Sequence, residues 1–130
     1  MTHIPQLLAA LLLASGATAY AANNHSHAHQ HQALHGGVVA ESNDIDYELV
    51  ARPEAITLHL RDHGKPLGVQ GASAKLTLLQ GADKSEVVLA PTGDGTLQSK
   101  GSFKVAAGTK VVALVTLPGK KVANVRFVLK

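Results

Sequence analysis

Hydrophobic and polar residues alternate along most of the chain after Gly36. Residues 45–52 read IDYELVAR and residues 55–62 read AITLHLRD, with an apolar residue at every second position. This period of two is typical of β-strands that have one face in a hydrophobic core. No ten-residue stretch of this part carries a convincing helical period, so the pattern predicts an all-β protein.

Turn residues separate the alternating segments at short intervals. Asp94-Gly95 suits a tight hairpin, Pro118-Gly119 fits a type II turn, and Gly64-Lys65-Pro66 ends a strand. We therefore predict one small antiparallel β-sandwich or barrel of about seven to nine short strands. The expected strands are 38–41, 45–52, 55–62, 74–80, 86–90, 96–100, 103–106, 110–117 and 121–129.

One segment departs from strict alternation. Residues 111–117 are apolar on both faces of the expected strand. This composition is typical of a central strand that is covered on both sides, or of one whose outer face is masked.

The second and third expected strands allow a register to be assigned. The segment Arg52-Pro53-Glu54-Ala55 has proline at the second position of a four-residue turn. A hairpin closed there sets Leu49 opposite Leu58, so that the apolar faces of the two strands coincide. It also sets Glu48 opposite His59 and Asp46 opposite Arg61 on the outer face. The Glu48–His59 pair is then either part of a metal site or an ordinary cross-strand charge pair.

The first residues of the chain predict export. Leu7 to Ala14 is an unbroken apolar run that is too short to span a bilayer, and Ala19-Tyr20-Ala21 fits the small-x-small rule for signal cleavage. We expect residues 1–21 to be a signal peptide, residues 22–35 a flexible His-rich tail and residues 36–130 the β-domain. The expected location is the periplasm.

The His-rich tail is the strongest chemical signal. Five of the eight histidines fall in the eleven residues from His25 to His35. Neutral imidazole is the commonest protein ligand for borderline divalent metals. Histidines spaced two apart allow one chain to surround an ion with several nitrogens, although the same composition also suits a solvated tether. The tail ligands that we predict are His25, His27, His29, His31 and His35.

The expected β-domain offers further nitrogen and oxygen ligands. His59 lies on a strand and His63 on the turn that follows it, and Glu48 faces His59 in the assigned register. Gly36 and Gly37 allow a sharp turn that could hold His35 against the domain. We add Glu48, His59 and His63 to the predicted ligands, although a strand histidine can equally be a simple surface residue.

Composition argues against several classes of function. There is no cysteine, and Met1 is the only methionine, so the soft ligands of a dedicated copper(I) site are missing. The net charge of +3 comes from scattered lysines, and two tyrosines, two phenylalanines and no tryptophan provide no stacking platform for nucleic acid. Nucleophile elbows, phosphate loops and zinc-protease motifs are absent, so we expect no enzyme.

Several short motifs resemble a group of small exported bacterial proteins. These proteins are associated with heavy-metal efflux systems and have counterparts as an extra domain in periplasmic adaptors of metal exporters of the resistance-nodulation-division type. The similarity covers about Leu34 to Lys130 and implies a periplasmic β-rich metal-handling accessory without fixing the metal. The matching segments are His35–Val39, Tyr47–Val50, Thr57–Pro66 and Gly71–Ala74.

The sequence therefore leads to two hypotheses. In the first, an exported β-domain binds a divalent ion (zinc, nickel, cobalt or copper(II)) and buffers it or delivers it to the adaptor of an efflux system. In the second, an immunoglobulin-like interaction module of the cell envelope carries a His-rich segment that is only a tether.

Overall fold

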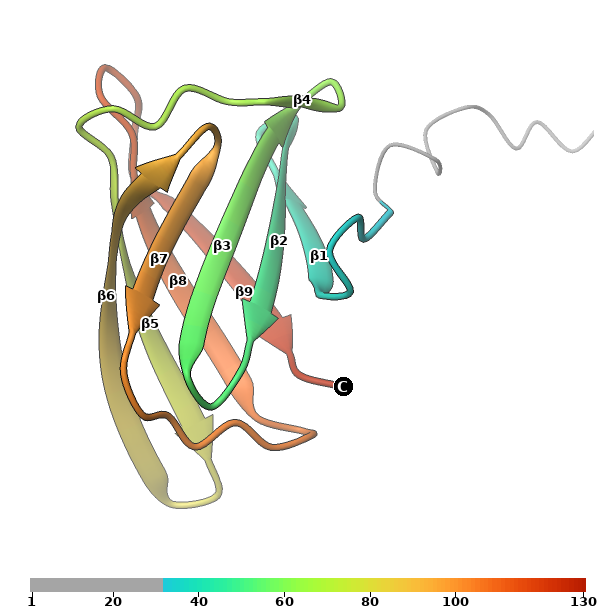
Figure 1. Cartoon of the computed structure of the whole chain (residues 1–130), viewed down its shortest axis with the longest axis vertical. Coiled ribbons are helices and arrows are strands. Elements are labelled where there is room, and N and C mark those ends of the chain that lie inside the picture. Colours follow the sequence, from blue (N-terminus) through green and yellow to red (C-terminus); the bar gives the residue numbers. More distant parts are fainter. Residues whose placement is uncertain (1–31) are drawn as a thin grey trace, which may run out of the picture.

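Nine β-strands make up the regular structure of residues 32–130, the part of the chain that the computed structural model describes (Figure 1). The predicted signal peptide, residues 22–31 and the predicted ligands His25, His27, His29 and His31 lie outside the described residues. The strands are β1 (Val38–Ser42), β2 (Ile45–Ala51), β3 (Ala55–Asp62), β4 (Lys65–Pro66), β5 (Ser73–Gln80), β6 (Asp83–Gly93), β7 (Thr96–Lys100), β8 (Lys110–Thr116) and β9 (Ala123–Val128).

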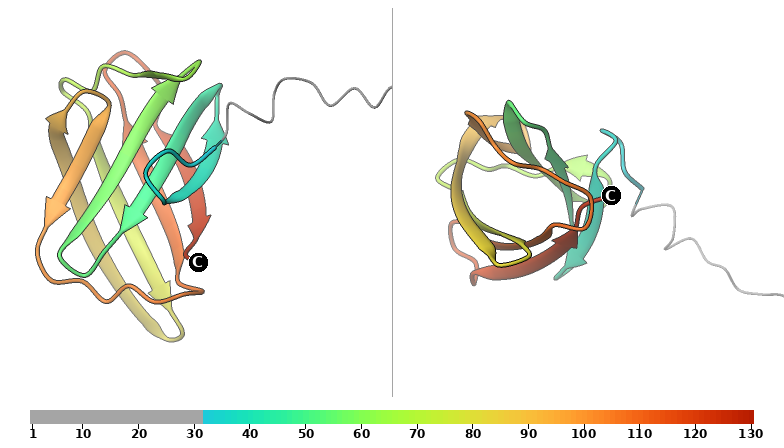
Figure 2. Two further views of the ribbon diagram at one scale, coloured as in Figure 1. Left: turned by 45° about the vertical axis from the view of Figure 1, so that its right-hand side comes forward. Right: turned by 90° about the horizontal axis from the view of Figure 1, so that it is seen from below.

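The strands form one antiparallel sheet that curls into a nearly closed barrel. Its order is β1-β2-β3-β7-β6-β5-β8-β9, and the short β4 pairs with β3. The two outermost strands, β1 and β9, lie side by side, which brings the ends of the sheet together (Figure 2). The predicted all-β fold is confirmed. Within residues 32–130 there is no helix that could cross a bilayer.

The barrel interior is filled by aliphatic residues from alternate strand positions. Leu58, Leu76, Leu89 and Leu97 are fully shielded from solvent, and the interior also takes in Tyr47 and Phe127. Each inward residue is followed by an outward one, as period-two alternation requires.

The β2–β3 hairpin has the predicted register. Leu49 pairs with Leu58, Glu48 with His59 and Asp46 with Arg61. The turn closes through two hydrogen bonds between the backbones of Arg52 and Ala55. The predicted turn at Pro118-Gly119 is also confirmed, because the Lys120 N–H donates to the Leu117 carbonyl and Gly119 has φ +74°.

The predicted strand 103–106 is wrong. This stretch is an extended loop, and the Phe103 N–H donates to the carbonyl of Pro53 in the β2–β3 turn. The alternation of apolar residues is real, because Phe103 and Val105 pack against the core. The loop crosses the end of the barrel without entering a strand ladder.

One expectation about the outer surface is also wrong. Leu114 on β8 is 42% exposed, so the apolar outer face of that strand is not covered. Glu48, Asp46 and Arg61 lie on the outer face, as the register predicts, but they are buried. Glu48 and Arg61 are buried because a preceding segment, residues 32–37, covers part of β2 and β3.

Candidate functional site

Residues 32–37, here called the anchor segment, lie across the outer face of the β2–β3 hairpin. The segment is attached through the Glu48 carboxylate, which accepts four hydrogen bonds. Oε1 accepts from the Leu34 backbone N–H (2.9 Å) and from Arg61 Nη1 (2.9 Å). Oε2 accepts from the backbone N–H groups of His35 (2.7 Å) and Gly37 (3.0 Å). Hydrogen bonds to an ionised carboxylate are among the stronger ones in proteins.

Arg61 completes the attachment from the neighbouring strand. Its Nη1 donates to Glu48, which lies diagonally across the hairpin because Arg61 is two residues beyond His59, the register partner of Glu48. Its Nη2 donates to the Gln32 carbonyl at 2.8 Å. The guanidinium thus joins both the carboxylate and the start of the anchor segment. Because both charges are shielded from water, they depend on each other for compensation.

Two glycines allow the anchor segment to lie this close to β2. Gly36 has φ +76°, a conformation that L side chains rarely adopt. At Gly37 a Cβ atom would come within 2.3 Å of the Leu49 carbonyl oxygen, which leaves no room for a side chain. The predicted sharp turn at these glycines is therefore present, and it directs the chain into β1.

The anchor segment places two histidines in contact. The His35 ring stacks on the His59 ring, with centroids 3.7 Å apart and an angle of 12° between the planes. His59 lies on β3 directly opposite Glu48. Glu48 binds the backbone of the anchor segment, and His59 stacks on the ring of His35 in the same segment.

The surroundings shift two pKa values in this site. Burial would raise the pKa of Glu48, but the hydrogen bonds from Leu34, Gly37, Arg61 and His35 outweigh it and lower the pKa to about 2. Burial, with a contribution from His35, lowers the pKa of His59. At neutral pH the site therefore contains an ionised Glu48 and a neutral His59, which is the form of imidazole that binds metals.

The geometry assigns Glu48 a role other than the predicted one. Both of its oxygens already accept two hydrogen bonds, so the carboxylate holds the anchor segment and has no remaining acceptor site for an ion. We therefore correct its predicted role from ligand to anchor. The sequence does not indicate this role, because three of the four donors are backbone N–H groups and the fourth, Arg61, lies opposite Asp46 in the register.

His35, His59 and His63 do not form a three-ligand group. Among residues 32–130 no cluster of three histidine, aspartate or glutamate side chains is placed to hold an ion. His63 lies on the exposed β3–β4 turn, and its Nδ1 contacts the Asp62 carboxylate at 2.5 Å. The stacked pair of His35 and His59 is therefore the part of the predicted ligand set that the structure brings together.

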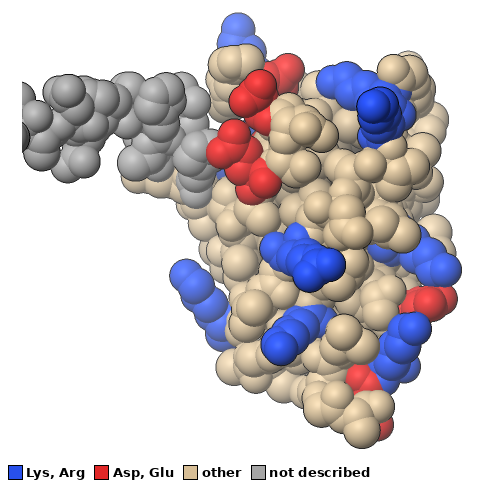
Figure 3. Space-filling model, turned by 180° about the vertical axis from the view of Figure 1, so that it is seen from behind, with Lys and Arg blue, Asp and Glu red and all other residues tan. Residues whose placement is uncertain are grey.

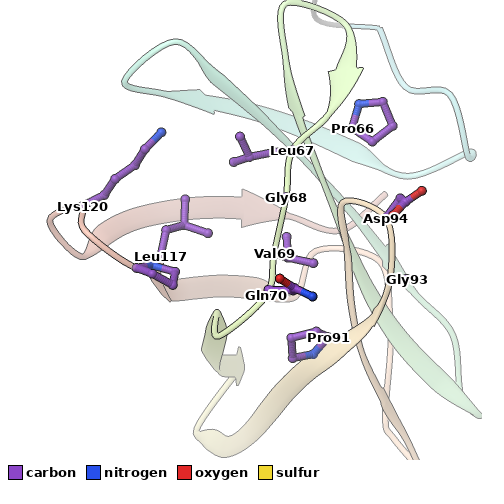
Figure 4. Close-up of a pocket in the computed structure, with 11 residues that line it drawn as sticks. Pro66, Leu67, Gly68, Val69, Gln70, Pro91, Gly93, Asp94, Leu117 and Lys120 are labelled. Atoms are coloured by element: carbon purple, nitrogen blue, oxygen red, sulfur yellow. The ribbon is translucent and has the colours of Figure 1, made fainter.

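A hollow at one end of the barrel differs in chemistry from the histidine pair. It measures about 830 Å³ and is bordered by the β3–β5 connection, the β6–β7 hairpin and the β8–β9 turn. Its charged lining residues, Asp94 and Lys120, lie on opposite sides of it (Figure 4). The lining otherwise consists mainly of proline, glycine and aliphatic residues, without a histidine.

Comparison of the chain with protein-family models, curated proteins and solved structures finds no match.

Proposed function

We propose that this protein is a periplasmic accessory that binds a divalent metal ion and buffers it or delivers it to an efflux system. The single observation that carries the proposal is the contact between His35 and His59. His35 is the last histidine of the His-rich run, and the anchor segment holds it against a second imidazole of the barrel. The His-rich run therefore ends in contact with His59, a histidine of the barrel whose pKa is lowered by burial.

The stacked geometry limits how the two rings can take part. The lone pair of an imidazole nitrogen lies in the ring plane, so two nearly parallel rings cannot point at one ion. One ring must turn before both can bind the same metal. We therefore assign the stack to the metal-free protein and expect the ion to recruit His35 together with His25, His27, His29 and His31.

The efflux partner follows from the resemblance of the sequence to accessory proteins of metal exporters. A periplasmic adaptor of such an exporter is the partner that we propose. The candidate ions remain zinc, nickel, cobalt and copper(II), because the available ligands are imidazoles without any thiolate.

Calorimetric titration of the protein beginning at Ala22 tests the proposal. We expect zinc or copper(II) to bind at about pH 7.5 and to bind much more weakly near pH 5, since protons compete for imidazoles with an ordinary pKa of about 6.5. Replacement of His25, His27, His29 and His31 by asparagine should remove most of the affinity. Equal affinity at both pH values, or in the substituted protein, would contradict the assignment of the ligands.

Two single substitutions locate the domain's contribution. His59→Asn removes the ring beneath His35, whereas His63→Asn changes an exposed turn residue. We expect His59→Asn to lower metal affinity more than His63→Asn. If both variants bind as the parent does, the ligands belong to residues 25–35 alone.

The second candidate function is an envelope interaction module whose His-rich segment is only a tether. The observation that favours it is independent of the histidines. It is the outer face formed by β5, β6, β8 and β9, where Leu79, Val88, Leu114 and Val128 are exposed in the described part of the chain.

A further inference from the structure

The outer face of the β6-β5-β8-β9 half of the barrel combines cations with exposed aliphatic side chains. We call it the basic face and define it by the outward residues Lys75, Lys84, Lys110 and Arg126, together with Leu79, Val88, Leu114 and Val128. The four aliphatic residues are between 37% and 64% exposed. They lie on four neighbouring strands, so their exposed side chains share one face of the barrel with the four cations.

Strand register arranges the two kinds of side chain alternately. Across the sheet, Lys84 pairs with Leu79, Leu79 with Lys110, and Lys110 with Val128. In a second row, Lys75 lies between Val88 and Leu114. Directly paired residues of an antiparallel sheet point to the same side, so every cation of these rows has an aliphatic neighbour.

Acidic residues are scarce on the basic face. Glu86 is the only acidic residue at the described outward positions of these four strands, and it pairs with Lys75 at 3.3 Å. Viewed from this side, Lys and Arg side chains are spread over the surface, whereas acidic side chains gather towards its margins (Figure 3). The β8–β9 connection continues the pattern at one end with Lys120, Lys121 and the exposed Val122.

We propose that the basic face docks on a bilayer surface that contains anionic phospholipid. Cations near such a surface are attracted by its negative potential, and short aliphatic side chains gain by entering the boundary between headgroups and acyl chains. Three of the four defining cations are lysines, and lysine is depleted in protein–protein interfaces but attracted to anionic lipid surfaces. The composition therefore fits a lipid surface better than a protein partner. This inference does not depend on metal binding.

Sedimentation with lipid vesicles tests the proposal. The protein begins at Ala22, which keeps all described residues, and the buffer has low ionic strength, about pH 7.5 and a chelator. We expect binding to vesicles of phosphatidylcholine mixed with phosphatidylglycerol, and at least tenfold weaker binding to phosphatidylcholine alone. Absence of binding to the anionic vesicles would overturn the proposal.

Two triple variants separate the basic face from net charge. Lys84→Glu, Lys110→Glu and Arg126→Glu change the basic face, whereas the matched control changes the exposed Arg52, Lys65 and Lys100 of the β2–β3–β7 half to glutamate. We expect the first variant to lose at least tenfold in vesicle affinity and the control to lose much less, with thermal melts showing that both fold. Equal losses would overturn the proposal, because they would indicate attraction by overall charge.

The aliphatic contribution has its own test. The double variant Val88→Ser, Val128→Ser leaves every charge in place. We expect it to weaken vesicle binding severalfold without changing retention on a column of immobilised polyglutamate. Unchanged vesicle binding would show that this surface binds any polyanion, and would contradict docking on lipid. Because the chelator excludes metal, failure of these experiments leaves the metal-binding proposal unaffected.

Discussion

Arg61 and Glu48 form an ion pair of 2.9 Å beneath the anchor segment, and their side chains are 6% and 0% exposed. Removing one partner of such a pair leaves the other buried without compensation. Here the carboxylate also holds three backbone N–H groups, so the pair attaches residues 32–37 to the barrel. Several properties of the protein should depend on this attachment.

Glu48→Gln should destabilise the protein by about 3–5 kcal/mol, the usual cost of breaking a buried ion pair. The amide replaces one acceptor oxygen with a donor that faces other donors, and Arg61 loses its counter-charge. Urea denaturation measures the change. Glu54→Gln, at the exposed β2–β3 turn, is the matched control and should stay within about 0.5 kcal/mol. Equal midpoints for the two variants would show that Glu48 is not an anchor.

Stability should fall in two stages as the pH is lowered. The folded pKa of His59 lies below its ordinary 6.5, so its contribution is complete above that value and is lost as pH falls towards the folded pKa. The folded pKa of Glu48 is about 2 against an ordinary 4.5, so its contribution is lost between these values. The urea midpoint should be measured across this pH range. Its dependence on pH should become weaker in the upper stage for His59→Asn and in the lower stage for Glu48→Gln. An unchanged profile in either variant would contradict the corresponding assignment.

Truncation should distinguish the anchor segment from the residues before it. A chain that begins at Gln32 keeps every described contact. A chain that begins at Val38 loses three of the four hydrogen-bond partners of Glu48 and keeps only Arg61. We expect the shorter chain to melt several degrees lower, because about 1 kcal/mol corresponds to roughly 4–8 °C in a domain of this size. Equal melting temperatures would mean that residues 32–37 add nothing to stability.

Gly37→Ala should displace the anchor segment, because its Cβ atom would lie 2.3 Å from a backbone oxygen of β2. The expected cost is about 1–3 kcal/mol, as for other overpacked positions. Nuclear magnetic resonance titration should show the pKa of His59 moving up towards 6.5 as the stack with His35 opens. Gly68→Ala, where a Cβ atom meets nothing within 4 Å, should leave that pKa unchanged.

Leu58→Ala tests the core of the β2–β3 hairpin. Leu58 is fully buried opposite Leu49, so its truncation should cost about 2–5 kcal/mol through the cavity that it leaves. His59→Ala changes the next residue on the outer face and should cost about 1 kcal/mol, mainly through loss of the ring stack. Thermal or urea unfolding measures both. Similar costs at the two positions would contradict the difference between the faces.

The β2–β3 hairpin could be predicted from the sequence because its information is local. A period of two assigns each residue to a face, and a proline-containing turn of four residues leaves one register in which the apolar faces coincide. The pairs Leu49–Leu58 and Glu48–His59 follow from these facts alone. The all-β fold and the turn at Pro118-Gly119 are determined in the same way.

Other features depend on contacts between distant residues and carry no local signal. Alternation in residues 103–106 records burial against the core, but only the tertiary structure decides that their backbone meets a turn instead of a strand. Residues 111–117 have the composition of a strand that is covered on both faces, yet Leu114 is exposed in the described part of the chain.

The sequence by itself determined which strand residues face inward and that a histidine cluster precedes the barrel. Only the tertiary structure decided that residues 32–37 fold back over Glu48, 14 residues from Leu34, and over Arg61, 29 residues from Gln32. The physical reason is that this attachment is made mostly by backbone N–H and carbonyl groups. Every non-proline residue has both groups, so no pattern of side chains predicts the attachment. The same contacts convert an outward glutamate from an apparent ligand into a buried anchor.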